Sequence, residues 1–452
     1  MRISGAMAAL ALACCAAHAA PLKQPPDFNQ VGPLASSASL VAAQKSVQQD
    51  AFELGYRIEG DRDAETDLVD IGADVAMLTR DRRISIFDHG LERFIDLDDA
   101  AHKFRNDSWY GVIDARIRAT AGASAARNMK QAGFDAFWVQ SELHVMTAED
   151  GVPEMVRRDS KDGSVHFFYG GPEVANYAPS EHRLSAQEAQ RFGRFLLDYS
   201  ALHPRIIADI VASGAVPARL SYLTQAGDKT VDTVWTLQSF AAVKAVYPLA
   251  RPVPVDHTGR PELVIAMLGS IAAAPKRSAE DFEASIAKAL TAHRAFQALL
   301  LALERDAQYG PCKTPCRMTK GVEAAAKRDP RAATLMGSFA DNAALDTAID
   351  ALKAMKRDDL TDTAMLDAHL GHLLVQAGRI DEALPVLSTA LRADAGLPGV
   401  YRSLGDAFRG SGDSVNAWLF YDLGRALPGG AEALSGVTAY EATMVKAHPE
   451  LF

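Results

Sequence analysis

Residues 370–387 read LGHLLVQAGRIDEALPVL, and residues 404–421 read LGDAFRGSGDSVNAWLFY. The same types of residue recur in the two stretches at a constant interval of 34 residues. The corresponding positions are Leu370, Gly371, Leu374, Gly378, Ala383 and Leu387 in the first stretch and Leu404, Gly405, Phe408, Gly412, Ala417 and Tyr421 in the second. The pattern predicts two helical hairpins, each with a glycine in the turn where a left-handed backbone is needed. Because one hairpin cannot bury both of its faces, neighbouring hairpins are expected to stack through one shared apolar seam.

This period resembles the tetratricopeptide repeat, which also combines a Leu-Gly pair, a turn glycine and an alanine in the second helix. Tyr401 stands at the early aromatic position of the second unit, whereas Asp367 departs from that pattern in the first. A weaker copy starts at Met336-Gly337, and residues 431–446 predict a closing helix. The resemblance implies an all-α repeat domain over residues 331–452.

A repeat array of this family implies a concave groove that takes a protein or peptide segment. The positions that would line this groove are Asp367, Leu374, Tyr401 and Phe408. A short array can also be purely structural and support a neighbouring domain. Both interpretations are open at this point.

Residues 49–255 alternate apolar and polar side chains and predict an antiparallel-sheet domain, so the whole chain is expected to be α+β. Tight turns are predicted at Asp81-Arg82 and Asp162-Gly163. Ser185 and Glu188 form a capping box that starts a helix. The predicted strands are 74–79, 83–87, 93–97, 137–145, 154–158, 164–169, 219–223 and 230–237, and short helices are expected over 40–54 and 124–132.

Residues 256–330 predict a helical connector, with a long amphipathic helix that starts after Ser278. Cys312 and Cys316 follow the end of this helix. In an oxidising compartment two thiols at this spacing are expected to form a disulfide. An alternative is a Cu(I) site, because Cys312, Cys316 and Met318 are all soft ligands.

The first residues indicate export from the cytoplasm. Arg2 precedes an apolar run over residues 6–17, and Ala17-His18-Ala19 offers small residues at a cleavage site. We expect a signal peptide over 1–19, a Pro- and Ser-rich linker over 20–48, and a periplasmic or secreted protein. Cys14 and Cys15 leave lipidation as an alternative. The apolar run is too short to span a bilayer, and no later stretch predicts a membrane span.

Charge and motifs exclude several classes of function. The net charge of −10 argues against a general nucleic-acid binder, which would carry a basic stripe. We find no nucleophile elbow, phosphate loop, dinucleotide fingerprint or zinc-protease motif, so no cofactor is expected. His369 and His372 lie one helical turn apart, but solvated polar positions are expected there instead of a metal site. The sequence does not indicate an oligomeric state.

Two alternatives to a binding scaffold use the sheet domain. Asp70-Ile71-Gly72-Ala73 resembles the active-site turn of retroviral-type aspartic proteases, in which Asp70 would share a proton with an aspartate from a second copy. Ile71 departs from the family pattern, which has a hydroxyl there. The second alternative is an apolar-ligand carrier, because aromatic residues gather in this domain: Trp109, Tyr110, Trp138, Phe167, Phe168 and Tyr169.

Overall fold

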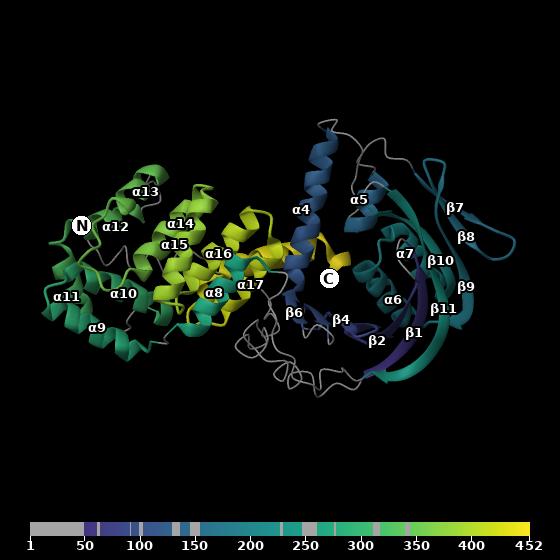
Figure 1. Cartoon of the computed structure of the whole chain (residues 1–452), viewed down its shortest axis with the longest axis horizontal. Coiled ribbons are helices and arrows are strands. Elements are labelled where there is room, and N and C mark those ends of the chain that lie inside the picture. Colours follow the sequence, from purple (N-terminus) through teal and green to yellow (C-terminus); the bar gives the residue numbers. More distant parts are fainter. Residues whose placement is uncertain are drawn as a thin grey trace. The chain divides into compact units, whose positions relative to one another are not determined.

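An antiparallel sheet and a series of helical hairpins make this an α+β protein (Figure 1). The computed structural model describes residues 49–60, 64–90, 92–98, 103–128, 136–144, 154–226, 229–245, 260–274, 277–310, 317–339 and 344–452. The sheet unit comprises Ser36–His257 together with Ala447–Phe452, and Thr258–Lys446 belongs to the helical unit. Within the described residues, no helix is long and apolar enough to cross a membrane.

The described strands of the sheet unit form one 11-stranded sheet in the order β6-β5-β4-β3-β2-β1-β11-β10-β9-β8-β7. Two meanders, β1 to β6 and β7 to β11, meet where β1 pairs with β11. The strands are β1 (Gln49–Glu59), β2 (Glu65–Ile71), β3 (Val75–Arg80), β4 (Arg83–Asp88), β5 (Arg93–Asp98), β6 (Lys103–Ser108), β7 (Met155–Asp159), β8 (Val165–Tyr169), β9 (Glu173–Arg183), β10 (Ala215–Ala226) and β11 (Lys229–Ala245).

The hairpin turns follow from local backbone chemistry. Asp81 adopts a positive φ of 51° between β3 and β4, and Gly163 adopts 86° between β7 and β8. Alternation of buried and half-buried residues along β5 and β8 matches a sheet with one face on a core. Both predicted turns and the antiparallel sheet are thus confirmed.

Helices α4 (Trp109–Asn128), α5 (Ala136–Leu143), α6 (Ala186–Tyr199) and α7 (Pro204–Ser213) supply the core of the sheet unit. The curved sheet wraps around α6 and α7 in Figure 1. The predicted capping box is present, because the Ser185 side chain accepts from the Glu188 amide and Glu188 accepts from the Ser185 amide. Large apolar side chains from both layers fill the space between them: Leu54, Tyr56, Val69, Phe192, Phe195, Leu196, Ile206 and Trp235.

Three sequence predictions in this unit differ from the structure, two in the kind of element and one in where a helix begins. The predicted strand 137–145 is helix α5, because its buried residues Phe137, Gln140, Ser141 and His144 follow helical spacing. The predicted short helix 124–132 begins much earlier, as α4, and its last part lies outside the described residues. The predicted helix 40–54 ends in β1, and residues 40–48 lie outside the described residues.

The C-terminal tail, Ala447–Phe452, belongs to the sheet unit, although the repeat resemblance placed it with the helices. Leu451 is 4% exposed and lies in the apolar core of the sheet unit. Its carbonyl oxygen accepts a hydrogen bond of 2.9 Å from the indole nitrogen of Trp109, at the start of α4. The rings of Tyr110 and Phe452 pack 5.2 Å apart. The helical unit is therefore inserted between two segments of the sheet unit.

The helical unit is a succession of short helices. They are α8 (Glu262–Ala273), α9 (Ala279–Thr291), α10 (Ala295–Tyr309), α11 (Arg317–Ala326), α12 (Pro330–Ser338), α13 (Leu345–Lys353), α14 (Ala364–Gln376), α15 (Ile380–Ala393), α16 (Pro398–Gly410), α17 (Ser414–Arg425), α18 (Gly430–Ala433) and α19 (Ser435–Ala447). The first helix of each hairpin packs against its second helix in α12–α13, α14–α15 and α16–α17, and α14 also packs against α16.

The repeated glycines explain how close the paired helices come. A Cβ atom at Gly371 would lie 2.5 Å from Cδ2 of Leu387, and one at Gly405 would overlap the ring of Tyr421. The turn glycines adopt positive φ angles, 71° at Gly378 and 91° at Gly412. Each small residue thus makes room for the large residue of the same repeat, as the period predicted. The closing helix is also present, as α19, with Met444 buried.

Candidate functional site: a charged pocket beside a filled helical array

Helix α10 covers the face of the array that the repeat resemblance assigned to a partner. It packs against α12, α14 and α16, which are the first helices of the three hairpins, whereas α8 packs against α15, a second helix. The buried residues of α10 occupy nearly its whole circumference: Phe296, Gln297, Ala298, Leu299, Leu300, Leu301, Leu303, Glu304 and Gln308. A helix that is buried all round is a core element.

Polar side chains of α10 also bind the loops that precede the first helices. The Gln297 side chain accepts from the Thr361 amide at 2.7 Å and donates to the Asp362 carbonyl at 3.1 Å. In the last turn of α10, Gln308 donates to Asp394 at 2.7 Å. These bonds fix the register of α10 against both repeat hairpins.

The magnitude of this burial decides whether a partner could displace α10. Full burial of one large apolar side chain contributes about 1.5–3 kcal/mol. Phe296, Leu299, Leu300, Leu301 and Leu303 would together contribute on the order of 10 kcal/mol, whereas a micromolar complex gains only about 8 kcal/mol. Because α10 packs against α9 and α11 as well as against the first helices of the hairpins, this burial makes it a core element of the folded helical unit.

The four predicted groove residues are accordingly buried. Their exposed fractions are 5% for Asp367, 0% for Leu374, 1% for Tyr401 and 5% for Phe408. Asp367 accepts a 2.7 Å hydrogen bond from Thr363, Tyr401 donates to the Ala395 carbonyl at 2.8 Å, and Phe408 stacks on Phe420. These residues stabilise the array, and as packed they cannot contact a partner.

Three carboxyl groups and one guanidinium lie where α10 meets the loops. Arg277 contacts Glu304 at 3.2 Å and also pairs with Asp362, while Asp394 lies 3.8 Å from the same guanidinium nitrogen. Glu304 is fully buried. Burial, a hydrogen bond to Asp394 and the charge of Asp362 raise the pKa of Glu304 to about 10. Glu304 is therefore protonated at neutral pH and donates to Asp394.

We expect this proton to make the helical unit less stable as pH rises. In an unfolded chain the carboxyl titrates near pH 4.5, so between about pH 4.5 and pH 10 the folded state holds a proton that the unfolded state has released. Glu304→Gln keeps a donor to Asp394 and removes the titration, so its stability should fall less with pH. Thermal unfolding of both proteins at several pH values checks this. Parallel pH dependences in the two proteins would contradict it.

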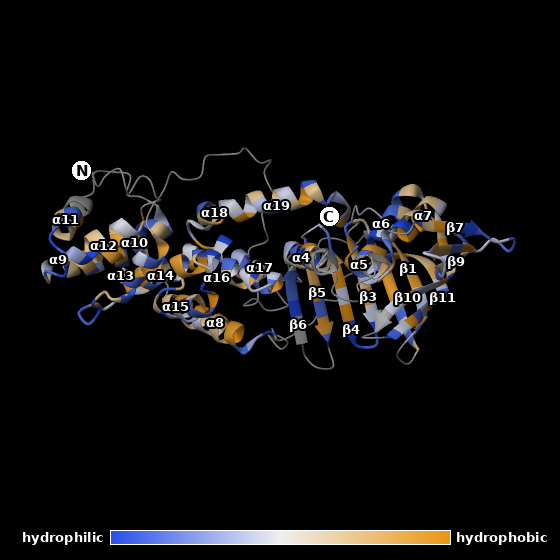
Figure 2. Ribbon diagram, turned by 90° about the horizontal axis from the view of Figure 1, so that it is seen from above, coloured by the Kyte–Doolittle hydropathy of each residue, from blue (hydrophilic) through white to orange (hydrophobic). Residues whose placement is uncertain are grey.

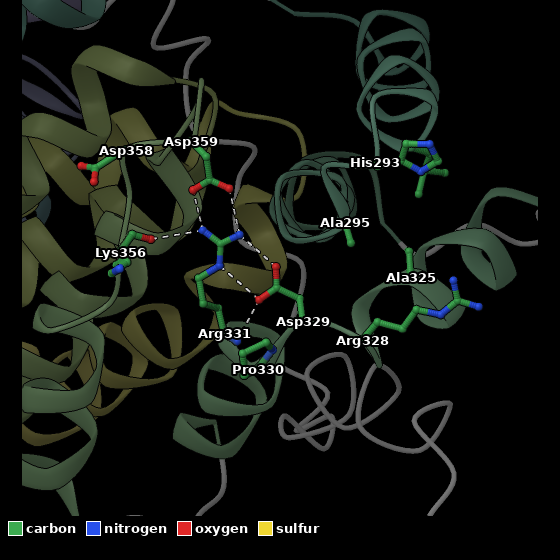
Figure 3. A pocket seen from close by; sticks show the side chains of 11 residues that line it. His293, Ala295, Ala325, Arg328, Asp329, Pro330, Arg331, Lys356, Asp358 and Asp359 are labelled. Atoms are coloured by element: carbon green, nitrogen blue, oxygen red, sulfur yellow. Dashed lines mark hydrogen bonds and ion pairs between the residues drawn. The ribbon is translucent and has the colours of Figure 1, made fainter.

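A pocket of about 800 Å³ lies in the helical unit where three inter-helix segments meet (Figure 3). These segments are the α9–α10 turn, the α11–α12 turn and the connection between α13 and α14. Its lining combines a small apolar part with many charges: Leu290, His293, Ala295, Ala325, Arg328, Asp329, Pro330, Arg331, Lys356, Asp358 and Asp359.

Arg331 organises the pocket from the first turn of α12. Its guanidinium binds Asp359 at 2.6 and 3.0 Å and Asp329 at 2.9 and 3.1 Å. Hydrogen bonds from Arg331 hold the pKa values of both carboxyls below their usual range. The guanidinium also lies over the ring of Phe296, 4.8 Å from its centroid, which links the pocket to α10. This part of the wall is held by side-chain hydrogen bonds, with one guanidinium shared by two carboxylates.

Arg328 and Lys356 are different, because neither has an ionic partner among the described residues. Both side chains are exposed. In the view of Figure 3 they lie at opposite sides of the pocket, with Arg331 between them. The neighbouring turn residues Arg294 and Lys327 are exposed as well. The pocket therefore presents available cations around a fixed ion-pair network.

Two short charged runs in the sequence contribute most of the pocket lining. Lys327-Arg328-Asp329-Pro330-Arg331 and Lys356-Arg357-Asp358-Asp359 are two runs of mixed charge, each just before a first helix of a hairpin. Such runs are usually solvated loops. Only the fold brings the two runs to one pocket.

Asp70 does not lie in a turn. It is part of β2, opposite Glu53 of β1 and Met77 of β3, within the continuous sheet. Burial, and secondarily the charge of Glu53, raise the pKa of Asp70 to about 6. Strands pair with β2 on both sides there, so the residue is not placed in a loop that could meet an aspartate from a second copy. Its Oδ1 is buried and has no hydrogen-bond partner among the described residues.

The aromatic residues that suggested an apolar-ligand carrier are mostly packed inside the sheet unit. Phe167 and Tyr169 of β8 are buried, and Trp109 packs edge-on against Phe87. Phe137 of α5 lies 5.2 Å from Tyr169. On this face the described helices already cover the aromatic cluster, so it offers a core instead of a vacant surface.

The expected solvated histidines are partly buried, and this prediction is wrong for His369. His369 is 7% exposed, contacts the Ser338 hydroxyl at 2.9 Å and packs on Phe339. Burial, followed by the charge of His372, lowers the pKa of His369 to about 4. His372 instead lies 3.3 Å from the Ser403 hydroxyl. Among the described residues, no cluster of His, Cys, Asp and Glu could hold a metal ion.

Comparisons with known proteins do not assign the chain to a family. No protein-family model matches its sequence, and no curated protein matches it. The predicted signal peptide and linker, and the predicted disulfide of Cys312 and Cys316, lie outside the described residues.

Proposed function

We propose that this protein is a binding scaffold that holds a segment of another protein at the pocket of its helical unit. The available cations Arg328 and Lys356, beside a prebuilt Arg331 network, carry the proposal. In this proposal the partner binds at the inter-helix turns, because α10 already packs against the face formed by the first helices of the hairpins, α12, α14 and α16.

We further propose that the array belongs with tetratricopeptide repeats. The support is the 34-residue period, the close approach at Gly371 and Gly405, and consecutive antiparallel helices over residues 364–425. An exported, periplasmic scaffold is consistent with the first nineteen residues. In that compartment Cys312 and Cys316 would form a disulfide between α10 and α11, two helices that reach the pocket.

Photo-crosslinking tests the proposed function directly. We would introduce a photoreactive side chain at Ala325, in the pocket, and at Thr389, an exposed position of α15, as a matched control. In the native host the Ala325 position should crosslink to a protein partner reproducibly, and the Thr389 position should not. The same products from both positions, or none from Ala325, would contradict the proposal.

A further inference from the structure

We infer that the sheet unit contains a pH-sensitive switch, in which protonation of His203 releases helix α5 from helix α7. The inference concerns the other unit of the chain and does not depend on the proposed function. His203 directly precedes α7 and is 2% exposed. Its ring contacts both helices, through two hydrogen bonds and one aromatic stack.

The two hydrogen bonds of His203 require a neutral imidazole ring. Its Nδ1 accepts from the backbone amide of Arg205 at 3.2 Å and so caps the start of α7. Because an amide can only donate, Nδ1 carries no proton, and Nε2 donates to the side-chain oxygen of Gln140 in α5 at 2.9 Å. A proton added at Nδ1 would remove the cap and place a positive charge at a helix N-terminus, where the helix dipole disfavours it.

The same ring also holds α5 through an apolar contact. It stacks on Phe137, with the ring centroids 5.7 Å apart and the planes at 6°, and Phe137 in turn packs on Tyr169 of β8. Burial, followed by the charge of Arg205, lowers the pKa of His203 to about 4. Separation of α5 from α7 would let the ring bind a proton in water and would expose Phe137 and Tyr169.

A second histidine, at the end of α5, acts in the same direction. His144 is 3% exposed and adopts a φ of 55°, a backbone region that favours glycine. Burial, followed by the charge of Arg116 in α4, lowers the pKa of His144 to about 3. Opening of α5 therefore relieves an unfavourable backbone conformation and allows a second ring to become charged.

Neighbouring carboxylates do not offset these charges, because neither histidine forms an ion pair with any described residue. Asp198 of α6 pairs with His89, and Asp209 of α7 pairs with Arg157. Glu142 of α5 is exposed. The remaining acidic and phenolic groups on the surrounding elements are Asp114 of α4, Tyr169 of β8 and Tyr222 of β10.

The switch should open as pH falls below about 6.5. In an open α5 the two rings titrate near the ordinary value of 6.5, whereas in the closed unit they stay neutral down to about pH 4. Acid therefore favours the open form, which binds more protons. Between pH 7 and pH 5 the ratio of open to closed molecules should rise roughly twentyfold for each histidine.

Hydrogen exchange of the full-length protein at pH 7 and pH 5, corrected for the intrinsic exchange rate and read by mass spectrometry, tests the inference. Protection of α5 should fall at least tenfold, while β1 and β11, paired at the centre of the sheet, stay protected. His203→Asn keeps an acceptor for the cap and does not titrate, so its fall should be at least fivefold smaller. The control His182→Asn, which changes a histidine of β9 that packs on Phe240, should match the wild type.

Three results would overturn the inference: unchanged protection of α5 at pH 5, an equal fall in His203→Asn, or loss of protection in β1 and β11 together with α5. If His203→Asn leaves α5 unprotected already at pH 7, His144→Asn decides the question. Asparagine tolerates the left-handed backbone at this position, and the cap on α7 remains intact. The fall in His144→Asn should be at least fivefold smaller than in the wild type, and an equal fall would refute the switch.

Discussion

Deleting the C-terminal tail, Ala447–Phe452, should lower the free energy of unfolding of the sheet unit by about 5 kcal/mol. The tail lies more than three hundred residues from α4 in sequence, yet Leu451 is buried in the core beside Trp109. Loss of a buried leucine side chain costs about 2–5 kcal/mol. The Trp109 indole would lose its hydrogen-bond acceptor, and Tyr110 would lose its contact with Phe452.

Denaturant unfolding monitored by far-UV circular dichroism measures this effect. Leu451→Ala should account for about half of the loss, because it leaves the backbone acceptor in place. Pro449→Ala is the matched control, since this exposed residue of the same segment should change stability little. An unchanged midpoint for Leu451→Ala would show that the tail is not part of the sheet unit.

The tail also changes how deletion experiments should be designed. Removal of residues 331–452 takes away the repeats and, with them, a part of the sheet core. Loss of a partner in such a variant would not distinguish a missing binding site from an unstable sheet unit. Point substitutions at Arg328 and Lys356 avoid this ambiguity.

Replacing Gly405 by alanine should destabilise the helical unit by about 3 kcal/mol. The new methyl group would overlap the ring of Tyr421, which is 2% exposed and cannot move freely. The Tyr421 hydroxyl donates to Asp406 at 2.7 Å, and its ring packs edge-on against Trp418. The backbones of α16 and α17 would have to separate, which opens the seam.

Gly399→Ala in the same helix is the matched control. A Cβ atom there meets nothing within 4 Å, so alanine should be neutral or stabilise the helix by up to about 1 kcal/mol. Thermal unfolding of the two variants compares them directly. Equal stability of Gly405→Ala and Gly399→Ala would mean that the repeated glycines do not mark a close helix contact.

Much of the fold could be predicted because its signals are local or periodic. Gly371 and Gly405 indicated the close helix pairs, and Asp81-Arg82 and Asp162-Gly163 indicated two hairpin turns. The single long helix predicted after Ser278 is wrong, because the chain turns at His293, whose φ is 59°, and forms α9 and α10; the apolar residues Phe296, Leu300 and Leu303 are buried on α10. The error at residues 137–145 arose because a short apolar segment fits both a strand and a helix period.

The features that decide function depend on contacts between distant residues. The stripe on α10 did not indicate that it would pack on α14 and α16, because those helices follow much later in the chain. Leu374 and Tyr401, which the sequence predicted to bind a partner, are therefore buried in the core of the helical unit. The pocket likewise combines turns from three places in the sequence, none of which carries a motif by itself.

Hydrogen exchange of α10, read by mass spectrometry on the full-length protein, tests most directly whether the first-helix face is permanently filled. The account predicts that backbone amides of Leu299–Leu303 exchange as slowly as those of α14 and α16, and much more slowly than those of α9, which buries only one face. Exchange of α10 as fast as α9, with α14 and α16 still protected, would show that α10 leaves the groove, and the partner site would return to Leu374 and Tyr401.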